Sequence, residues 1–394
     1  MVFRVEIGTA LEYSQAQDDP ELIIYSVVFV RCQCYNRCVR FTGFFYGLIL
    51  EESGMSQEES YEDLAERIQQ MQNIAWEIAR KRNPAATLKR GFHAKGTGVR
   101  GKFKINADLT ERLQVGLFRP NVEYDALVRF SNARGEVLGD LSKDQRGIAI
   151  RLKTNPSEDL SSSDVLEIQD FLMTNTPVSF ARNPNQFIEV GEILLGGIGM
   201  VFPRLVKKYG FKEARRILGV FLAPIISFAP YQQNTYWSRT SYQFGEVAVR
   251  FLVLPSAGSK KSSAGQQLFG VLRALTQGAS QREHYLRENL KAALMEGDLS
   301  FDFCLQLFVD ERKTPIEDAY IEWKEADAQP VLVATLTIPK QIFDDQLQRE
   351  MEFMAFSPWN TDKIIPLGAI NLARKKVYDA SAMHRGGTVA SGRN

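Results

Sequence analysis

The stretch Arg90-Gly-Phe-His93-Ala-Lys-Gly-Thr-Gly-Val-Arg-Gly-Lys-Phe103 decides how this chain is interpreted. It places one of only three histidines beside a run of glycines. A histidine can accept and return a proton near neutral pH, which lysine and arginine side chains do not do. The glycines alone would also suit a phosphate loop, but no Gly-Lys-Ser or Gly-Lys-Thr ending follows. An isolated histidine of this kind is more often a structural residue in a turn.

A second pair of residues with possible chemistry lies near the other end of the chain. Arg374 and Tyr378 are four residues apart, so in a helix they share one face. A guanidinium beside a phenol favours the phenolate form, and a ferric ion favours it further. Tyrosinate is an established axial haem ligand. Because ordinary Arg–Tyr packing pairs have the same spacing, this pair alone is weak evidence.

Composition excludes several classes of protein. The 394 residues are 44% hydrophobic, which supports a substantial core. The net charge of +1 gives no global field toward nucleic acid or an anionic membrane. Four cysteines are too few for a disulfide scaffold, so a reducing, cytoplasmic compartment is expected, with Cys304 as a buried thiol. No stretch has the length of a transmembrane segment, because arginines interrupt the apolar residues 22–50.

The first part of the chain differs from the rest. Residues 1–54 are rich in cysteine and aromatic residues and have no clear period, whereas Met55 begins a segment that reads like a natural protein start. We therefore expect residues 1–54 to be a peripheral N-terminal extension and residues 55–394 to form the functional domain. Cys32, Cys34 and Cys38 suit a metal site only poorly, since their spacing is not a standard zinc pattern. Incidental thiols are the favoured interpretation.

The pattern of apolar residues predicts an α+β fold. A helix is expected over residues 57–82, where apolar residues recur at helical spacing. Further helices are expected within residues 184–230 and 277–296. Residues in strand-like runs are 101–105, 126–131, 147–152, 246–254, 301–309 and 331–338. Many antiparallel strands with inserted helices indicate an antiparallel β-barrel surrounded by helices.

Four separated segments resemble the catalase superfamily in the same chain order. The first is the opening stretch around His93, and the second is Val128-Arg-Phe-Ser131, followed by Arg146-Gly147. The third runs from Asp170 to Arg182, and the fourth comprises Ala355-Phe-Ser-Pro358 with Arg374 and Tyr378. The similarity spans about residues 85–387. It implies a catalase-like haem domain with haem b as cofactor.

The resemblance also implies roles for individual residues. His93 would be the distal acid–base group, and Ser131 would accept a hydrogen bond from its ring. Tyr378 would ligate the iron, with Arg374 holding it as tyrosinate. The haem propionates would meet arginines by charge-assisted pairing, and aromatic side chains would line the haem or its channel. The arginines are Arg90, Arg129 and Arg385, and the aromatic residues are Phe180 and Phe187, whose alternative role is core packing.

Two departures from the family pattern concern the distal side. Thr174 falls where catalases have their distal asparagine, and a one-residue shift would place Asn175 there instead. Phe92 occupies a position that is usually valine in catalases and threonine in catalase-like allene oxide synthases. The chain also lacks the length for the extra C-terminal domain of large catalases. It therefore resembles the small, catalase-related hydroperoxide enzymes more closely.

These observations lead to one expected function and two alternatives. We expect haem-dependent cleavage or rearrangement of hydroperoxides, with organic or fatty-acid hydroperoxides as the substrate class. The alternatives are a hydrogen peroxide catalase and a haem-binding protein without turnover. Expected partners are the hydroperoxide itself, a lipoxygenase as a functional link, and further copies of the chain in a homo-oligomer. Nucleic acid is not an expected partner.

Overall fold

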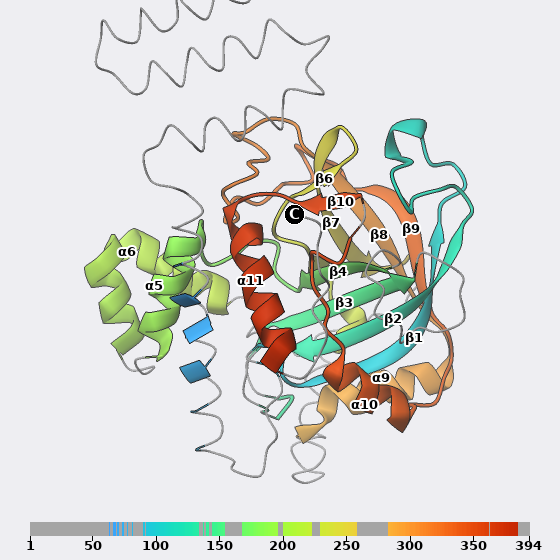
Figure 1. Ribbon diagram of the computed structural model, residues 1–394, viewed down its shortest axis with the longest axis horizontal. Coiled ribbons are helices and arrows are strands. Elements are labelled where there is room, and N and C mark those ends of the chain that lie inside the picture. Colours follow the sequence, from blue (N-terminus) through green and yellow to red (C-terminus); the bar gives the residue numbers. More distant parts are fainter. Residues whose placement is uncertain are drawn as a thin grey trace, which may run out of the picture. The chain divides into compact units, whose positions relative to one another are not determined.

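The chain divides into two units, Met1–Ser60 and Tyr61–Asn394, and the described residues belong to the second unit. The computed structural model describes residues 90, 92–133, 137, 139–141, 144–153, 168–195, 200–222, 229–257, 283–361 and 363–384, with scattered residues between Asp63 and Lys81 (Figure 1). The expectations for residues 1–54, including the three clustered cysteines, lie outside the described residues.

The central element is a closed antiparallel β-barrel of eight strands. Each strand pairs with the next, and β9 pairs with β1 to complete the barrel. Two short strands, β6 (Tyr242–Phe244) and β10 (Ile364–Pro366), extend the sheet beside β7. The barrel predicted from the sequence is thus confirmed. Its strands are β1 (Gly96–Ile105), β2 (Glu123–Asn132), β3 (Arg146–Lys153), β4 (Ile168–Thr174), β5 (Tyr236–Trp237), β7 (Val247–Pro255), β8 (Leu299–Leu307) and β9 (Val331–Ile338).

Aromatic side chains fill the interior of the barrel. Alternate residues of each strand point inward, and many of them are phenylalanines. The rings of Phe171 and Phe303 lie 4.8 Å apart, and those of Phe103 and Phe303 lie 5.1 Å apart. An eight-stranded barrel is just wide enough for such side chains. Because the lumen is packed, a large ligand has to bind outside the barrel.

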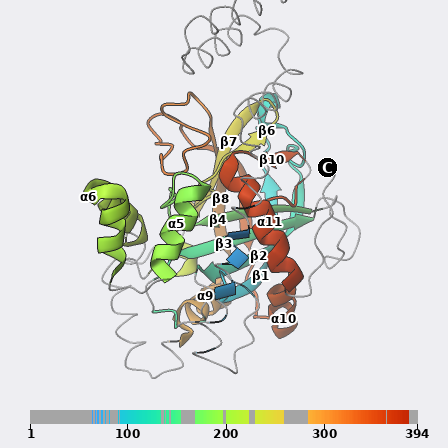
Figure 2. The same cartoon turned by 60° about the vertical axis from the view of Figure 1, so that its left-hand side comes forward.

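The outer face of strands β1 to β4 is covered by C-terminal segments of the chain. Helix α10 (Asp345–Phe353) begins at Asp344, whose carboxylate caps it by accepting from two backbone N–H groups. It packs Leu347 and Met351 against Leu127 of β2. Helix α11 (Ala369–His384) runs alongside the same wall in both views (Figures 1 and 2). This outer face, between the wall and α11, is where the residues of interest gather.

The remaining helices lie around the barrel. They are α5 (Pro184–Leu195), α6 (Val201–Leu222) and α9 (Tyr285–Glu296), with short 3-10 turns at Glu111–Leu113 and Tyr231–Gln233. Every described residue between Asp63 and Lys81 is helical, in agreement with the helix predicted there. The predicted helical region 184–230 contains α5 and α6, and Cys304 is buried as predicted. Among the described residues, no helix is both long and apolar enough to cross a membrane.

Candidate functional site

His93 is held in an unusual backbone conformation directly before β1. Its φ is 54°, in the left-handed region that few side chains tolerate, although histidine is among those enriched there. The backbone N–H of His93 donates to the carbonyl of Ala133 at 2.9 Å, which ties the loop to the end of β2. Its ring nitrogen Nδ1 lies 2.9 Å from Oγ of Ser131. A strained residue with an oriented ring is typical of a functional position.

Gly147 lies directly beside the ring of His93. Gly147 lies opposite Ser131 in the pairing of β2 with β3. A Cβ atom at Gly147 would lie 2.7 Å from Cε1 of His93 and 2.9 Å from Oγ of Ser131. Real Cβ atoms do not lie this close to other heavy atoms. Glycine is therefore needed here so that the ring of His93 can approach the backbone of β3 this closely.

Gly147→Ala is accordingly expected to displace the His93 ring while leaving the barrel folded. A misplacement of about 1 Å can lower a reaction rate by about 10²-fold. We expect a loss of that order in hydroperoxide turnover per bound haem, with a small change in thermal stability. Gly297→Ala is the matched control, because nothing lies within 4 Å of a Cβ at that position. Equal turnover for the two variants would contradict the placement of the ring.

The register of β3 with β4 separates the two candidates for the distal polar residue. Thr174 lies opposite Gly147, so its side chain is on the face that carries His93. Asn175 lies beyond the strand end, where its side-chain oxygen accepts from the backbone N–H of Arg146 at 2.8 Å. Its amide nitrogen donates to Asn234 at 3.3 Å. The register therefore places Thr174 on the face of His93, whereas the amide of Asn175 bonds to Arg146 and Asn234.

Two buried arginines brace the segment around His93. Arg129 of β2 donates to the carbonyls of His93 and Ala94 at 2.9 and 3.3 Å, and burial lowers its pKa. Arg90 donates to the carbonyls of Met351 and Met354 at 2.9 and 2.7 Å, at the C-terminus of α10. The partial negative charge at a helix C-terminus favours such a cation. Both guanidinium groups lie close enough to His93 to act on its charge.

Arg374 and Tyr378 lie on one face of α11, as their spacing predicts. The guanidinium of Arg374 lies 3.5 Å from the hydroxyl oxygen of Tyr378, and its carbon is 5.4 Å from the ring centroid. Its other nitrogen donates to Thr240 at 3.0 Å and to Asn371 at 2.9 Å. Burial alone would lower the pKa of Arg374, but the oxygens of Tyr378 and Tyr242 outweigh it and raise the pKa above the usual value.

Arg239 belongs to the same group, although no sequence motif indicated it. It lies in the short turn between β5 and β6, with φ at 62°. Burial, followed by the nearby charge of Arg374, lowers its pKa to about 10, whereas Tyr378 acts in the opposite direction. The neighbouring Thr240 accepts the hydrogen bond from Arg374, so the turn is tied to α11. No signal in the sequence alone could have found this residue, because its position depends on that long-range contact.

The charges around His93 test whether the site suits an anionic cofactor. Burial first, and then Arg129, Arg239, Arg90 and Arg374, lower the pKa of His93 to about 3. The ring is therefore neutral at ordinary pH. Four arginines around a neutral histidine create a strongly positive environment. The carboxylates of a bound ligand would balance this charge. Haem carries two propionates, so the donor set fits haem bound through Tyr378.

The other residues predicted from the sequence lie elsewhere or are not described. Phe180 and Phe187 stack on one another with centroids 5.0 Å apart, and Phe180 packs against the small core between α5 and α6. This arrangement agrees with their alternative role in packing. Phe92 is 38% exposed beside His93. Arg385 lies outside the described residues.

Part of the chain is similar in sequence to known proteins. A family model described as catalase matches residues 76–192, which include His93, Ser131 and Thr174. Catalase from Staphylococcus epidermidis is 32% identical over 103 residues, which are 26% of this chain and 18% of that protein. Catalase from Methanosarcina barkeri is 33% identical over 100 residues, or 25% and 18% of the two chains.

Residues 76–192 therefore resemble the catalase family, and the chain has a catalase-like fold. Solved structures with a similar fold include catalase A from Saccharomyces cerevisiae, with a TM-score of 0.59 at 18% identity. That match covers 78% of this chain and 63% of the yeast chain. A fungal catalase gives a TM-score of 0.59 at 20% identity, covering 78% and 61%. At these identities the structural similarity establishes the fold alone, and the sequence matches span less than a fifth of the curated relatives' length.

Proposed function

We propose that this catalase-like protein binds haem b at the site formed by His93, Ser131, Arg374 and Tyr378, and that it cleaves the O–O bond of hydroperoxides. The observation that carries the proposal is the gathering of four arginines around an oriented, neutral histidine and a tyrosine. The charges with the largest effect on the ring of His93 are all cationic, and they come from these four arginines. Such an environment would attract the propionates of haem, while Tyr378 would supply a phenolate ligand.

Each residue then has a defined task. Tyr378 would bind the iron as tyrosinate, and Arg374 would stabilise its negative charge at 3.5 Å. Arg129 and Arg90 would meet the propionates, and we add Arg239 to this set. Arg385 stays a prediction from the resemblance. Haem, when bound, supplies a ferric iron that weakens the O–O bond of a coordinated hydroperoxide.

His93 would move the proton in this reaction. Its Nδ1–H would donate to Ser131, which leaves Nε2 as the basic nitrogen. Nε2 would take the proton from the hydroperoxide O–H and deliver it to the leaving oxygen. A neutral ring is the form required for the first step, and burial, together with the surrounding arginines, keeps it neutral. Ser131 and Gly147 fix the ring in one plane, so little reorganisation is needed.

The pH dependence of the reaction follows from the lowered pKa of His93. A histidine with its ordinary pKa near 6.5 would be mostly protonated at about pH 5 and could not act as a base. With a pKa of about 3, His93 stays neutral throughout that range. The rate per haem should therefore be flat from about pH 8 to about pH 5. A decline with a midpoint near pH 6.5 in stopped-flow measurements would contradict this environment.

We propose organic hydroperoxides, including those of fatty acids, as the substrate class. Thr174 offers one hydroxyl and one methyl group where an asparagine would offer an amide. Phe92, 38% exposed, adds apolar surface next to His93. Both features suit an alkyl chain better than a small polar peroxide. A lipoxygenase would be a suitable source of such substrates.

The substrate experiment compares two reactions on the same haem-loaded protein. Oxygen evolution reports the dismutation of hydrogen peroxide, and loss of conjugated-diene absorbance reports consumption of a fatty-acid hydroperoxide. We expect the second reaction to be the faster one at equal substrate concentration. Faster oxygen evolution would support the alternative of a hydrogen peroxide catalase. No turnover of either substrate would support a haem-binding protein without activity.

A further inference from the structure

Helix α6 has an exposed face that neither the barrel nor the haem proposal uses. In both views α6 lies on the far side of α5 from the barrel (Figures 1 and 2). Gly210, with φ at 80°, breaks it into two helical segments. Val201, Leu205, Ala214 and Ile217 form the buried stripe that packs against α5. The opposite side of both segments faces solvent.

The exposed side of α6 combines positive charge with aromatic rings. Phe211 is 64% exposed and Phe202 is 37% exposed, and their rings meet edge to face at 5.9 Å. Met200, directly before the helix, is 54% exposed. The helix contains six basic residues and one acidic residue. Of the basic residues, the exposed ones are Arg204, Lys207, Lys208, Lys212 and Arg215.

This concentration of charge is hidden in the composition of the whole chain, whose net charge is only +1. The sequence on either side of these basic residues is uncharged. No charged residue occurs from Ile193 to Pro203 or from Ile217 to Ser238. Basic residues next to exposed phenylalanines, within an otherwise uncharged sequence, are typical of helices that lie in the interface of an anionic membrane.

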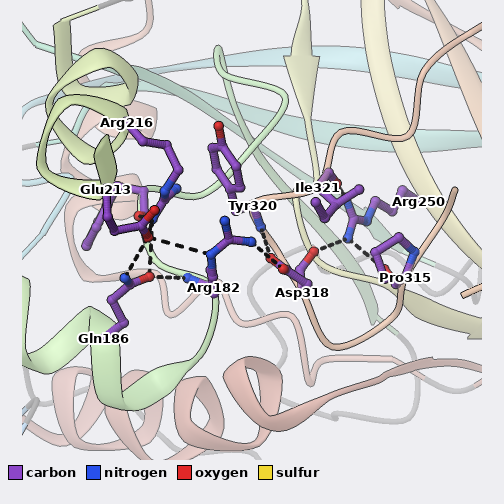
Figure 3. A network of polar contacts seen from close by, with 10 residues as sticks. Arg182, Gln186, Glu213, Arg216, Arg250, Pro315, Asp318, Tyr320 and Ile321 are labelled. Carbon is purple, nitrogen blue, oxygen red and sulfur yellow. Dashed lines mark hydrogen bonds and ion pairs between the residues drawn. The ribbon is translucent and has the colours of Figure 1, made fainter. Parts of the chain in front are cut away.

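Ion pairs hold the inner side of α6 against neighbouring segments, so that its outer side is left as the exposed surface. Figure 3 shows Glu213 of α6 between two arginines, and it pairs with Arg182 at 3.6 Å and with Arg216 at 2.6 Å. Arg182 continues to Asp318 at 2.6 Å, and the guanidinium of Arg216 lies 3.8 Å from the ring centroid of Tyr320. Lys208, although exposed, also pairs with Glu189 of α5 at 2.9 Å. These contacts anchor α6 to the segments beside it.

We infer that α6 is a docking element for the surface of an anionic phospholipid membrane. Phe202 and Phe211 would enter the boundary between headgroups and acyl chains, and the exposed lysines and arginines would meet lipid phosphates. Nucleic acid would use the positive charge but not the apolar side chains between the cations. The inference concerns attachment and does not depend on haem or on peroxide chemistry.

Vesicle co-sedimentation of the full haem-loaded chain tests this docking surface. Vesicles of phosphatidylcholine alone and of phosphatidylcholine mixed with phosphatidylglycerol are compared. Binding is expected only to the mixed vesicles, and it should weaken as salt rises from about 0.1 M to about 1 M, where the screening length falls from about 10 Å to about 3 Å. Absence of binding to the mixed vesicles at low salt would overturn the inference.

Two double variants separate the charge from the aromatic contribution. Lys207→Glu with Lys212→Glu should lower partitioning by more than about tenfold, since each basic residue contributes roughly fivefold. Phe202→Ser with Phe211→Ser should lower it roughly tenfold or more. Matched controls are Lys104→Glu with Lys324→Glu, and Ile342→Ser, whose side chain is 75% exposed.

The readouts keep this inference apart from the proposed function. All variants should retain haem content and turnover of a water-soluble alkyl hydroperoxide, because none of the substituted residues contacts the site. Equal loss of vesicle binding in the α6 variants and their controls would overturn the inference. Tight binding of a DNA duplex without binding to the mixed vesicles would overturn it too, since α6 would then serve a different partner.

Discussion

His93→Ala is expected to slow hydroperoxide cleavage by roughly 10²–10⁴-fold, the usual cost of removing a positioned general acid–base group. Haem content should stay unchanged, because Arg374 and Tyr378 lie together on α11, whereas His93 lies before β1. The measurement is the initial rate with a fatty-acid hydroperoxide and with hydrogen peroxide, each scaled to bound haem. Both substrates need the same proton transfer, so both rates should fall.

Two further variants make the histidine experiment specific. Ser131→Ala should cost less than His93→Ala, since the ring remains and loses only its partner at 2.9 Å. His284→Ala is the matched control, because His284 lies before α9 and makes no side-chain cap hydrogen bond there. Near-wild-type turnover by His93→Ala would contradict the proposed proton transfer by His93, whatever the cofactor is.

Tyr378→Phe is expected to lose most of the bound haem. The substitution removes the only oxygen that Tyr378 offers to a metal and leaves the ring and its packing in place. The four arginines could still attract the propionates, so a residual, weakly held haem with an altered spectrum is expected. Haem content is measured against protein concentration after gel filtration.

The control for this variant is a buried tyrosine away from the site. Tyr285→Phe removes a hydroxyl from the start of α9, where no role in haem binding is proposed. It should keep its haem and its melting temperature within a few degrees of the wild type. If Tyr378→Phe kept its haem as well as Tyr285→Phe does, the iron would have another ligand.

The barrel could be predicted because its strands carry their own local signal. The predicted strand Val331–Ile338 matches β9 residue for residue, and residues 126–131 and 147–152 lie within β2 and β3. Strands β4, β5, β6 and β10 were not predicted as strands. The last three contain two or three residues, which are too few to show a period. They form because long-range pairing completes the sheet, as where Ile364 meets Phe244.

The parts of the candidate site that lie within short sequence motifs could be predicted. His93 with Ser131, and Arg374 with Tyr378, are pairs that the motifs contain, and each pair is in contact. The choice between Thr174 and Asn175 required the register of β3 with β4, because a shift of one residue reverses the face on which a side chain lies. Arg239 required the contact of its turn with α11.

Resonance Raman spectroscopy of the ferric protein shows whether Tyr378 is the ligand of a bound haem iron. We expect a high-spin ferric haem with vibrations of an iron-bound phenolate, and we expect those vibrations to disappear in Tyr378→Phe. A spectrum with the signature of a histidine or thiolate ligand in the wild-type protein would contradict it, as would phenolate vibrations that persist in Tyr378→Phe.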